Sequence, residues 1–398
     1  MSRPEPPRYV LNTLETLRAA GYPAYPVGGC VRDMLLGVRP KDWDVCTAAL
    51  PEQTVALFPH TVPTGIRHGT VSVMQGKRRV EVTTFRTDAP TGDHRHPESV
   101  RFVDDLREDL SRRDFTVNAM ALDENGAVID LFGGEEDLRR GLIRCVGEPR
   151  ERFDEDALRM FRALRFSAQL GFALDGPTLG ALRQQAPLAA ALSPERIRDE
   201  TEKTLLTDRP EILTMAVETG LLDRFLLRRV PLGAEEMSRL AALPKQPLPR
   251  WAAFCALLKD GGMIPSAEAF LRALRADNRT IRVCEDCCTL LEAPAPQTDY
   301  ERKRVLHAVG EESALCFARC SDALRGGKSA AALRRVLSSG ECWDIRALAV
   351  TGDDLLSRGL RGKELGDTLE RLLERVMAHP EDNRRDVLLA LAGRRGEE

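Results

Sequence analysis

The chain has 398 residues, which is long enough for two to four domains with sizeable cores. Hydrophobic residues make up 43% and charged residues 30%, a balance typical of a globular rather than a disordered protein. The formal net charge of -3 excludes a uniformly basic chain, so any contact with nucleic acid must come from local basic patches.

The start of the chain is polar and rich in proline, and it contains no apolar segment typical of a secretory signal. No later run of about 18 apolar residues could span a bilayer. The ten cysteines are too few for a disulfide framework in a chain of this length. These features predict a cytoplasmic protein with reduced thiols.

A helix is expected over residues 10–20, where apolar residues recur at helical spacing, and a short strand should follow it. Gly28 and Gly29 come next, and they allow positive φ and close approach of backbone N–H groups to a ligand. A short amphipathic helix is expected to begin there and to stop at Gly37. An anionic group could rest on the N-terminus of this helix, with Arg32 adding a positive charge.

Asp42 and Asp44 follow a proline turn at an interval of two residues. In a strand this interval places both carboxylates on one face, while Trp43 and Val45 point to the other. Two adjacent anions attract a divalent cation, and Mg²⁺ is held in proteins by one or two carboxylates together with substrate phosphates. A solvated pair of aspartates in a surface turn is the alternative, and the glycine turn just upstream argues against it.

The two segments together resemble nucleotidyltransferases of the polymerase β superfamily, and more narrowly class II CCA-adding enzymes and their bacterial poly(A) polymerase relatives. The matching residues are Gly28, Gly29, Cys30, Val31, Arg32 and Asp33, with Asp42, Trp43 and Asp44. The resemblance implies an α+β head of the polymerase β-like type, with a mixed sheet and helices, followed by an all-helical neck, body and tail.

Residues 69–74 and 79–85 alternate in the manner of strands, and the second is expected to give the carboxylate strand an antiparallel neighbour. Glu81 could then be a third acidic group at the site, or simply an exposed strand glutamate. Residues 87–99 are charged and rich in turn formers, which predicts a loop. It could be an ordinary surface connection, but class II CCA-adding enzymes have a mobile loop at the corresponding place.

The segment 109–121 contains the second family motif, in which the second arginine contacts the incoming nucleotide; this role maps to Arg113. The third motif lies in residues 155–166, which are expected to form one helix. Charged residues recur there every three positions, separate from an apolar row: Asp156, Arg159, Arg162 and Arg165. Solvated charges alone would explain either pattern.

In the family, this helix carries the aspartate and arginine that read the Watson-Crick edge of the incoming base. A carboxylate accepts from the exocyclic amino group that cytosine and adenine share, and an arginine donates to the neighbouring ring nitrogen or carbonyl. Uracil and guanine present a carbonyl instead, which would leave Asp156 facing another acceptor.

Helical patterns continue to the C-terminus, interrupted by proline-rich connectors, and a glycine turn between two helices at residues 351–366 resembles the tail of bacterial class II CCA-adding enzymes. Five cysteines at 284, 287, 288, 316 and 320 could hold zinc, but they lie in helical segments without histidine, so core thiols are expected. The expected divisions are a nucleotidyltransferase head (1–139), a neck with the template helix (140–206), a helical body (207–292) and a tRNA-binding tail (293–398).

The resemblance implies an enzyme that adds C, C and A to tRNA 3′ ends from CTP and ATP, with tRNA bound through its acceptor and T arms. The tRNA 3′-hydroxyl would attack the α-phosphate, two Mg²⁺ ions about 4 Å apart would be held by Asp42 and Asp44, and Gly29 and Arg32 would hold the triphosphate. The alternatives are a CC-only or A-only enzyme, a poly(A) polymerase and an inactive RNA-binding module.

Overall fold

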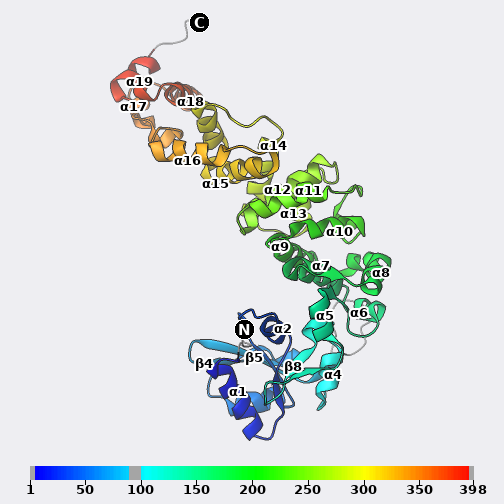
Figure 1. The fold of residues 1–398 in the computed structure, drawn as a ribbon. Helices are drawn as coiled ribbons and strands as arrows, with labels where there is room; N and C mark the ends of the chain where they lie inside the picture. Colours follow the sequence, from blue (N-terminus) through cyan, green and yellow to red (C-terminus); the bar gives the residue numbers. More distant parts are fainter. Residues whose placement is uncertain (1–4, 89–99, 394–398) are drawn as a thin grey trace. The chain divides into compact units, whose positions relative to one another are not determined.

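The computed structural model describes residues 5–88 and 100–393, and the chain divides into two compact units, residues 1–224 and 225–398. Figure 1 shows the sheet with its helices in the first unit and helices in the second. The expected α+β head followed by helices is therefore confirmed. None of the helices in the described ranges has the length and apolar character needed to cross a membrane. The finer division into four domains stays a prediction.

A mixed five-stranded sheet in the order β1-β2-β5-β4-β3 forms the centre of the first unit. Its strands are β1 (Ala24–Pro26), β2 (Asp44–Thr47), β3 (Thr61–Gly65), β4 (Thr70–Gln75) and β5 (Arg78–Thr84). The strands expected at 69–74 and 79–85 are thus present within a residue of their predicted limits.

The pairing of β2 with β5 differs from the expectation. The two strands run parallel, with Asp44 opposite Glu81, so the prediction of an antiparallel neighbour at residues 79–85 was wrong; β1 is the antiparallel partner of β2. The reason is the connection between them. Helix α3 (Pro51–Leu57) returns the chain to the other end of the sheet, and two hairpins then bring β5 beside β2 in the same direction.

Packing against the sheet decides which side of β2 is available for chemistry. Trp43 and Val45 are buried in a core that includes Leu17 of α1 (Arg8–Ala19). Because side chains alternate along a strand, the intervening Asp42 and Asp44 face away from this core and are exposed. The alternation predicted from the sequence is therefore confirmed.

Three small two-stranded pairs complete the strands of the first unit. They are β6 (Arg86–Asp88) with β7 (Val100–Phe102), β8 (Met120–Leu122) with β9 (Val128–Asp130), and β10 (Leu142–Ile143) with β11 (Ala173–Leu174). β6 and β7 are antiparallel and flank residues 89–99. The loop predicted at 87–99 lies mostly in that range, outside the described residues, and its mobility stays a prediction.

Helices α6, α9 and α10 contact α7, whose apolar face is buried. Beside α1 and α3, the helices of the first unit are α2 (Gly29–Leu35), α4 (Leu106–Ser111), α5 (Gly134–Arg140), α6 (Pro149–Glu155), α7 (Leu158–Leu170), α8 (Gly176–Gln185), α9 (Pro194–Leu205) and α10 (Leu213–Glu218).

One predicted helix is in fact two. The segment 155–166 is broken at Asp156, which has an extended backbone (φ −150°, ψ 103°) between α6 and α7. Its carboxylate accepts from the N–H of Leu158 at 3.1 Å. The expectation of one continuous helix was therefore wrong. The Asp156 carboxylate accepts from a backbone N–H at the start of α7, so a new helix can begin there without a preceding helical turn.

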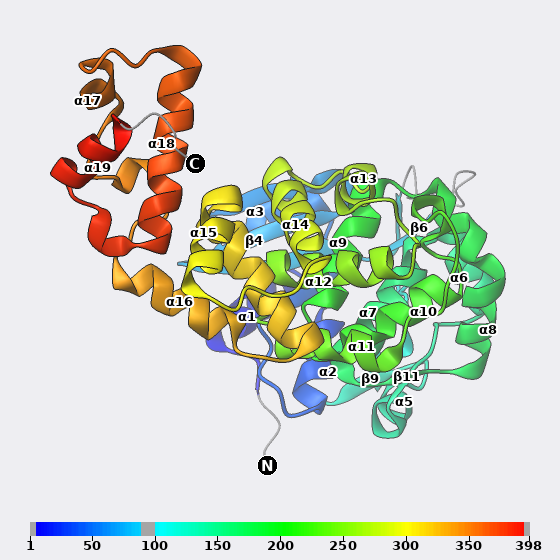
Figure 2. The ribbon, with the colours of Figure 1, turned by 90° about the horizontal axis from the view of Figure 1, so that it is seen from above.

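In the described part of the second unit every regular element is helical. Its α-helices are α11 (Ala234–Arg239), α12 (Pro247–Asp260), α13 (Ala267–Ala273), α14 (Asn278–Leu291), α15 (Asp299–Arg325), α16 (Ser329–Ser339), α17 (Gly352–Leu356), α18 (Gly362–Ala378) and α19 (Arg385–Ala392). Helix α15 changes direction at Gly310, where φ is 78°. Figure 2 shows α17, α18 and α19 grouped at the C-terminal end, where they share a core.

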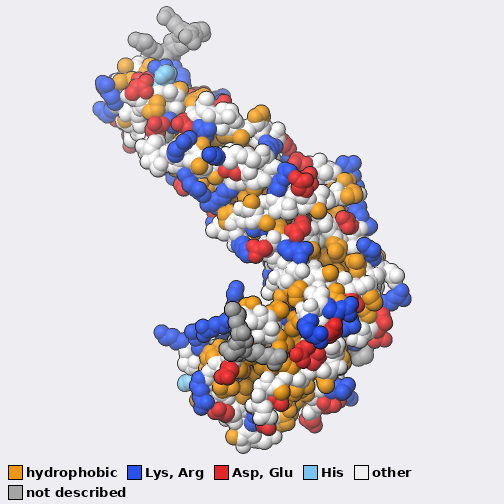
Figure 3. All heavy atoms as spheres, in the orientation of Figure 1, with side chains coloured by type: hydrophobic (Ala, Val, Ile, Leu, Met, Phe, Trp, Pro, Cys, Tyr) orange, Lys and Arg blue, Asp and Glu red, His pale blue; other side chains and the backbone are white. Residues whose placement is uncertain are grey.

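The glycine turn predicted in the tail is present between α17 and α18, where Gly359 and Gly362 both have positive φ. On the face drawn in Figure 3, Lys and Arg side chains of the helical unit alternate with Asp and Glu. This mixture agrees with the near-neutral net charge of the chain.

Candidate active site

The glycine pair forms a tight turn between β1 and α2. Gly28 has φ of 81°, and its N–H donates to the carbonyl of Met120 at 3.0 Å. A Cβ at this position would lie 3.0 Å from Nη1 of Arg113. Both the backbone conformation and the adjacent guanidinium therefore disfavour a side chain at this position. The turn and the short helix ending near Gly37 are as predicted.

Arg32 is buried in this site, with 4% of its surface exposed. Its Nη1 donates to Oδ1 of Asn118 at 2.6 Å, and its Nη2 donates to Oδ1 of Asp33 at 2.7 Å. Its guanidinium also lies 5.4 Å from the ring centre of Phe166 in α7. These contacts fix the charge of Arg32 in place rather than leaving it in solvent.

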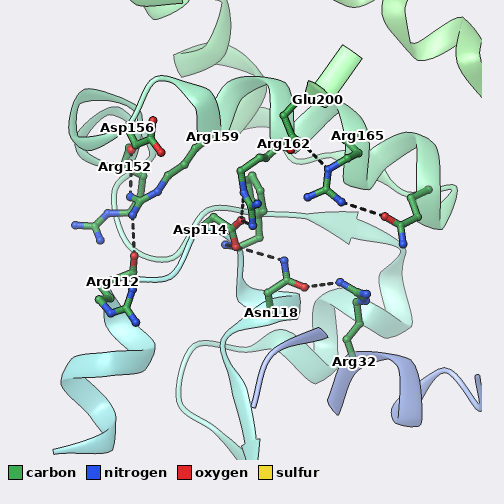
Figure 4. Close-up of polar contacts among 12 residues, drawn as sticks. Arg32, Arg112, Asp114, Asn118, Arg152, Asp156, Arg159, Arg162, Arg165 and Glu200 are labelled. Carbon is green, nitrogen blue, oxygen red and sulfur yellow. Dashed lines mark hydrogen bonds and ion pairs between the residues drawn. The ribbon is translucent and has the colours of Figure 1, made fainter. Parts of the chain in front are cut away.

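A buried network continues from Arg32 to α7, as Figure 4 shows. Nδ2 of Asn118 donates to Oδ1 of Asp114 at 3.3 Å, and Oδ2 of Asp114 accepts from Nε and Nη2 of Arg162 at 2.8 and 2.6 Å. Although burial opposes its charge, Arg162 lowers the pKa of Asp114 to about 2. Arg32, Asn118, Asp114 and Arg162 thus form one chain of hydrogen bonds, named here the Arg32–Arg162 network.

The acidic face comprises Asp42 and Asp44, with Glu81 opposite Asp44 on β5. Although the Asp44 side chain is open to the pocket, the surrounding pocket walls displace part of its solvent and raise its pKa; Arg113 opposes this change, and the charges of Glu81 and Asp42 add to it. The repulsion among the three carboxylates is the electrostatic signature of a site that a cation can stabilise. Arg79 lies 3.4 Å from Glu81 and partly offsets that charge.

Arg113 lies between the acidic face and the glycine turn. Its Nη2 donates to Oδ2 of Asp109 at 3.0 Å, while its Nε is buried without a hydrogen-bond partner among the described residues. Asp109 is fully buried and also accepts two hydrogen bonds from Arg112. Burial opposes the charge of Arg113, but Asp109 raises its pKa, so the guanidinium stays protonated.

The predicted template residues approach the same site from the start of α7. Nη2 of Arg196 in α9 donates to Oδ2 of Asp156 at 2.9 Å and to Oδ1 at 3.2 Å. Arg159 donates to Oε2 of Glu155 at 2.6 Å and to the carbonyl of Arg112 at 2.9 Å. The two side chains are therefore held by neighbours, and Figure 4 shows them at the same end of α7.

The other arginines of α7 lie further along the helix. Nε of Arg165 donates to Oε2 of Glu200 at 2.6 Å, and its guanidinium lies 4.0 Å from the ring centre of Phe166. The guanidinium of Arg162 lies 5.3 Å from the same ring. Together with Arg32, these residues place three positive charges around one aromatic side chain.

One pocket of about 820 Å³ in the first unit joins these groups. The residues predicted from the sequence that line it are Gly29, Arg32, Asp44, Arg113, Asp156, Arg159, Arg162 and Arg165. Asp42 is not part of its wall, although it lies beside Asp44 on the exposed side of the sheet. A pocket with carboxylates at one side and arginines around the remainder suits a ligand that carries phosphates and a polar ring.

Among the polar residues that line the pocket, Asp114, Asn118 and Arg196 were not predicted as site residues, and neither was Glu200, which pairs with Arg165 outside the lining. Asp114 and Asn118 lie within the segment 109–121, but nothing local distinguishes them from solvated residues. Arg196 and Glu200 pair with residues 40 and 35 positions away, respectively. Contacts of this separation leave no periodic signal in the sequence.

Three protein-family models match parts of this chain. Residues 24–144 match the model of the poly A polymerase head domain, residues 171–230 that of an RNA and SrmB-binding site of polymerase A, and residues 248–392 that of tRNA nucleotidyltransferase domain 2. The glycine turn, acidic face and cationic pocket all lie in or beside the head domain. The chain is therefore a nucleotidyltransferase with a poly(A) polymerase-type head.

The relatives define the family more narrowly. The chain is 41% identical over 375 residues to the CCA-adding enzyme of Geobacillus stearothermophilus, covering 92% of this chain and 90% of that protein. It is 39% identical to the CCA-adding enzyme of Lactiplantibacillus plantarum, with 95% and 94% covered. The chain belongs to the CCA-adding enzymes and is a tRNA nucleotidyltransferase, as the resemblance predicted.

Solved structures agree with this assignment. The crystal structure of the Bacillus stearothermophilus CCA-adding enzyme in complex with CTP superposes with a TM-score of 0.83 at 37% identity, covering 98% of this chain and 97% of that one. The Thermotoga maritima CCA-adding enzyme complexed with tRNA has a TM-score of 0.68 at 22% identity, with 98% and 97% covered, and shows the shared fold.

Proposed function

We propose that the chain adds C, C and A in turn to the 3′ end of tRNA, using CTP and ATP and releasing pyrophosphate. The observation that carries this proposal is the single pocket that holds Asp44 at one side and Asp156 with Arg159 at another. An enzyme without a nucleic acid template must read the base with its own side chains, and it must do so within reach of the groups that act on the α-phosphate.

The donor set of the acidic face fits Mg²⁺, which prefers carboxylate oxygens. Asp42 and Asp44 would hold the ion, with Glu81 as a neighbouring carboxylate. The pKa of Asp44 is raised, first by loss of surrounding solvent and then by the charges of Glu81 and Asp42, and a bound cation would offset both effects. The ion would supply Lewis-acid stabilisation of charge on the phosphate oxygens. The family uses divalent metals generally, and the choice of Mg²⁺ is part of this proposal.

The remaining charges of the pocket would hold the nucleotide. Gly29 and Arg32 would contact the triphosphate, and Arg113, which lies over the glycine turn, would contact the same group. Asp156 would accept from the exocyclic amino group of C or A, and Arg159 would donate to the adjacent ring atom. The protein contacts of both side chains limit their rotation, which suits a fixed reading surface.

Arg162 and Arg165 would act mainly as positioning residues. Arg162 is tied to Asp114 and Arg165 to Glu200, so each links α7 to another part of the first unit. Because both guanidiniums line the pocket, they also raise its positive potential toward the triphosphate.

The tRNA would bind through its acceptor and T arms, with the helical tail contributing contacts. We also propose a cytoplasmic location, because the substrates would be tRNA and nucleoside triphosphates and because the ten cysteines, all free thiols, suit a reducing compartment.

The test uses tRNA transcripts that lack the 3′ terminal sequence, incubated with CTP alone, ATP alone or both, and the products are sequenced. We expect CC from CTP alone and CCA from the mixture. Addition that stops at CC with both nucleotides would indicate a CC-only enzyme, and addition of A only to tRNA already ending in CC would indicate an A-only enzyme. Long A tails would indicate a poly(A) polymerase, and no product would indicate an RNA-binding module.

A further inference from the structure

Three cysteines of the second unit meet at one point in its core. Cys287 on α14 and Cys316 and Cys320 on α15 place their sulfur atoms within 4.8 Å of one another. All three side chains are buried, and all ten cysteines of the chain are free thiols. Their burial agrees with the core role expected from the sequence, but their convergence goes beyond it.

The separation of the three sulfur atoms is close to that of thiolates around a metal ion. A zinc ion with sulfur ligands at about 2.3 Å and tetrahedral angles separates those sulfur atoms by about 3.8 Å. Small changes of side-chain torsion would bring the observed cluster to this separation. Cys288, the next residue on α14, lies outside this group, and its sulfur contacts the carbonyl of Ala252 at 3.8 Å. Cys320 likewise contacts the carbonyl of Pro249 at 3.4 Å, so it is the convergence of the three sulfur atoms that distinguishes the group.

A fourth ligand is available one helical turn before Cys287. Cys284 is also buried and lies on the same helix, where its sulfur contacts the carbonyl of Leu248 at 4.0 Å and would turn away from this carbonyl to bind an ion. The four residues form a C-x2-C pair on α14 and a C-x3-C pair on α15, which are spacings found in structural zinc sites. Figure 2 shows the two helices side by side.

A nearby cation offsets the negative charge that a cluster of thiolates would carry. Arg319 lies between Cys316 and Cys320 in the sequence of α15. Within the described residues its Nε is buried without a hydrogen-bond partner. A metal-thiolate cluster would give this buried donor a negative neighbour.

We propose that Cys287, Cys316 and Cys320 bind one soft divalent cation of the zinc type, with Cys284 as the fourth ligand. Each coordinating thiol releases its proton to solvent as its sulfur binds the ion, so no oxidant or reductant is needed. The bound ion joins α14 to the part of α15 that follows Gly310 and stabilises the second unit. This site is separate from the proposed nucleotide pocket, which lies in the first unit.

The test uses tag-free full-length protein, purified under reducing conditions and stripped of metal, and titrated with Co²⁺ as a spectroscopic substitute for Zn²⁺. We expect one equivalent per chain to produce a sulfur-to-cobalt charge-transfer band, which Zn²⁺ then displaces. Carboxylates such as Asp42 and Asp44 cannot produce this band, because their ligand atoms are oxygen. We also expect Zn²⁺ to raise Tm and a chelator to reverse the change.

Two variants separate the cluster from the other thiols. Cys287→Ala should weaken Co²⁺ binding by more than roughly 100-fold, since even the loss of an outer contact to a metal ligand costs about 10–100-fold. Cys288→Ala, a buried neighbour on the same helix, should keep the band. The absence of a charge-transfer band in the wild-type protein, or an unchanged Co²⁺ affinity in Cys287→Ala, would overturn the proposal. A disulfide that forms within the cluster despite the reducing conditions, and that prevents metal binding, would also overturn it.

Discussion

Replacing Asp156 with asparagine tests whether its carboxylate selects the base. Asparagine keeps the shape of the side chain and an oxygen that can accept from the N–H of Leu158, so the start of α7 should be retained. The amide also gains donors, which can meet the carbonyl that uracil and guanine present. Asp156→Asn should therefore lower the preference for CTP over UTP without preventing the reaction.

The size of the change follows from the contacts of Asp156. A hydrogen bond to a charged group contributes about 1.5–3 kcal/mol, which corresponds to a factor of roughly 10–150. The Asp156 side chain is 19% exposed and shares its charge with Arg196, so screening favours the lower part of this range. The ratio of kcat/KM for CTP to that for UTP should fall by about 10-fold or more, measured as single-nucleotide addition to a tRNA lacking its 3′ end.

Two further variants make this result interpretable. Asp154→Asn changes a carboxylate two positions away that bonds Gln185 at 2.6 Å and does not line the pocket, so its selectivity should match the wild type. Asp156→Ala also removes the hydrogen bond from the N–H of Leu158 and should lose about 1 kcal/mol of stability in addition to selectivity. A wild-type CTP to UTP ratio in Asp156→Asn, with both rates lowered equally, would refute the template role.

Three other outcomes are expected. Asp44→Ala, or Asp42→Ala, should lower addition of both nucleotides by roughly 1,000-fold or more while tRNA affinity in a filter-binding assay is unchanged, and chelation of divalent cations should do the same. Asp114→Asn should remove about 2 kcal/mol of stability at neutral pH. Although burial opposes its charge, Arg162 lowers the pKa of Asp114 to about 2 in the folded protein, below its value in the unfolded chain, so the ionised carboxylate stabilises the fold at any pH above the unfolded pKa. Gly28→Ala should cost about 1–3 kcal/mol in denaturant unfolding and also lower kcat.

Each of these outcomes has a result that would contradict it. Near-normal turnover by Asp42→Ala would exclude the proposed metal ligands. The stability that Asp114 supplies should be lost as the pH falls from about 5 to 2. If the free energy of unfolding of Asp114→Asn fell over this pH range as steeply as that of the wild type, the pair with Arg162 would contribute nothing. Gly21→Ala, at a positive φ with open space around it, is the control for Gly28→Ala: it should destabilise the protein and leave kcat unchanged.

The sequence was informative wherever a local rule sets the structure. The interval between Asp42 and Asp44 gave their common face, because side chains in a strand alternate whatever the strand pairs with. The glycine turn before α2 was equally predictable, since few other residues adopt positive φ. The candidate residues on α7 were found through a family motif, because their spacing alone would also fit a solvated helix face.

Features that depend on distant parts of the chain were not predictable. The direction of β5 beside β2 depends on where α3 and two hairpins return the chain, which no property of residues 79–85 records. At Asp156 the chain can either continue the helix or use the aspartate side chain to accept from a backbone N–H. The contact of Asp156 with Arg196, 40 positions away, favours the second arrangement. The cysteine cluster likewise required two helices to be placed side by side before its sulfur atoms could be compared.

The Arg32–Arg162 network has a consequence for any attempt to divide the protein. Its hydrogen bonds join residues that are far apart in the sequence: 86 positions separate Arg32 from Asn118, and 48 separate Asp114 from Arg162. The hydrogen bonds between Asp114 and Arg162 therefore form only when α7 is packed in place. A fragment that ends at residue 139 would leave the Asp114 carboxylate without its main cation, and an unpaired buried charge is strongly unfavourable. A fragment with this boundary should therefore be less stable than the first unit as a whole, and it would lack the wall of the nucleotide pocket that α7 supplies.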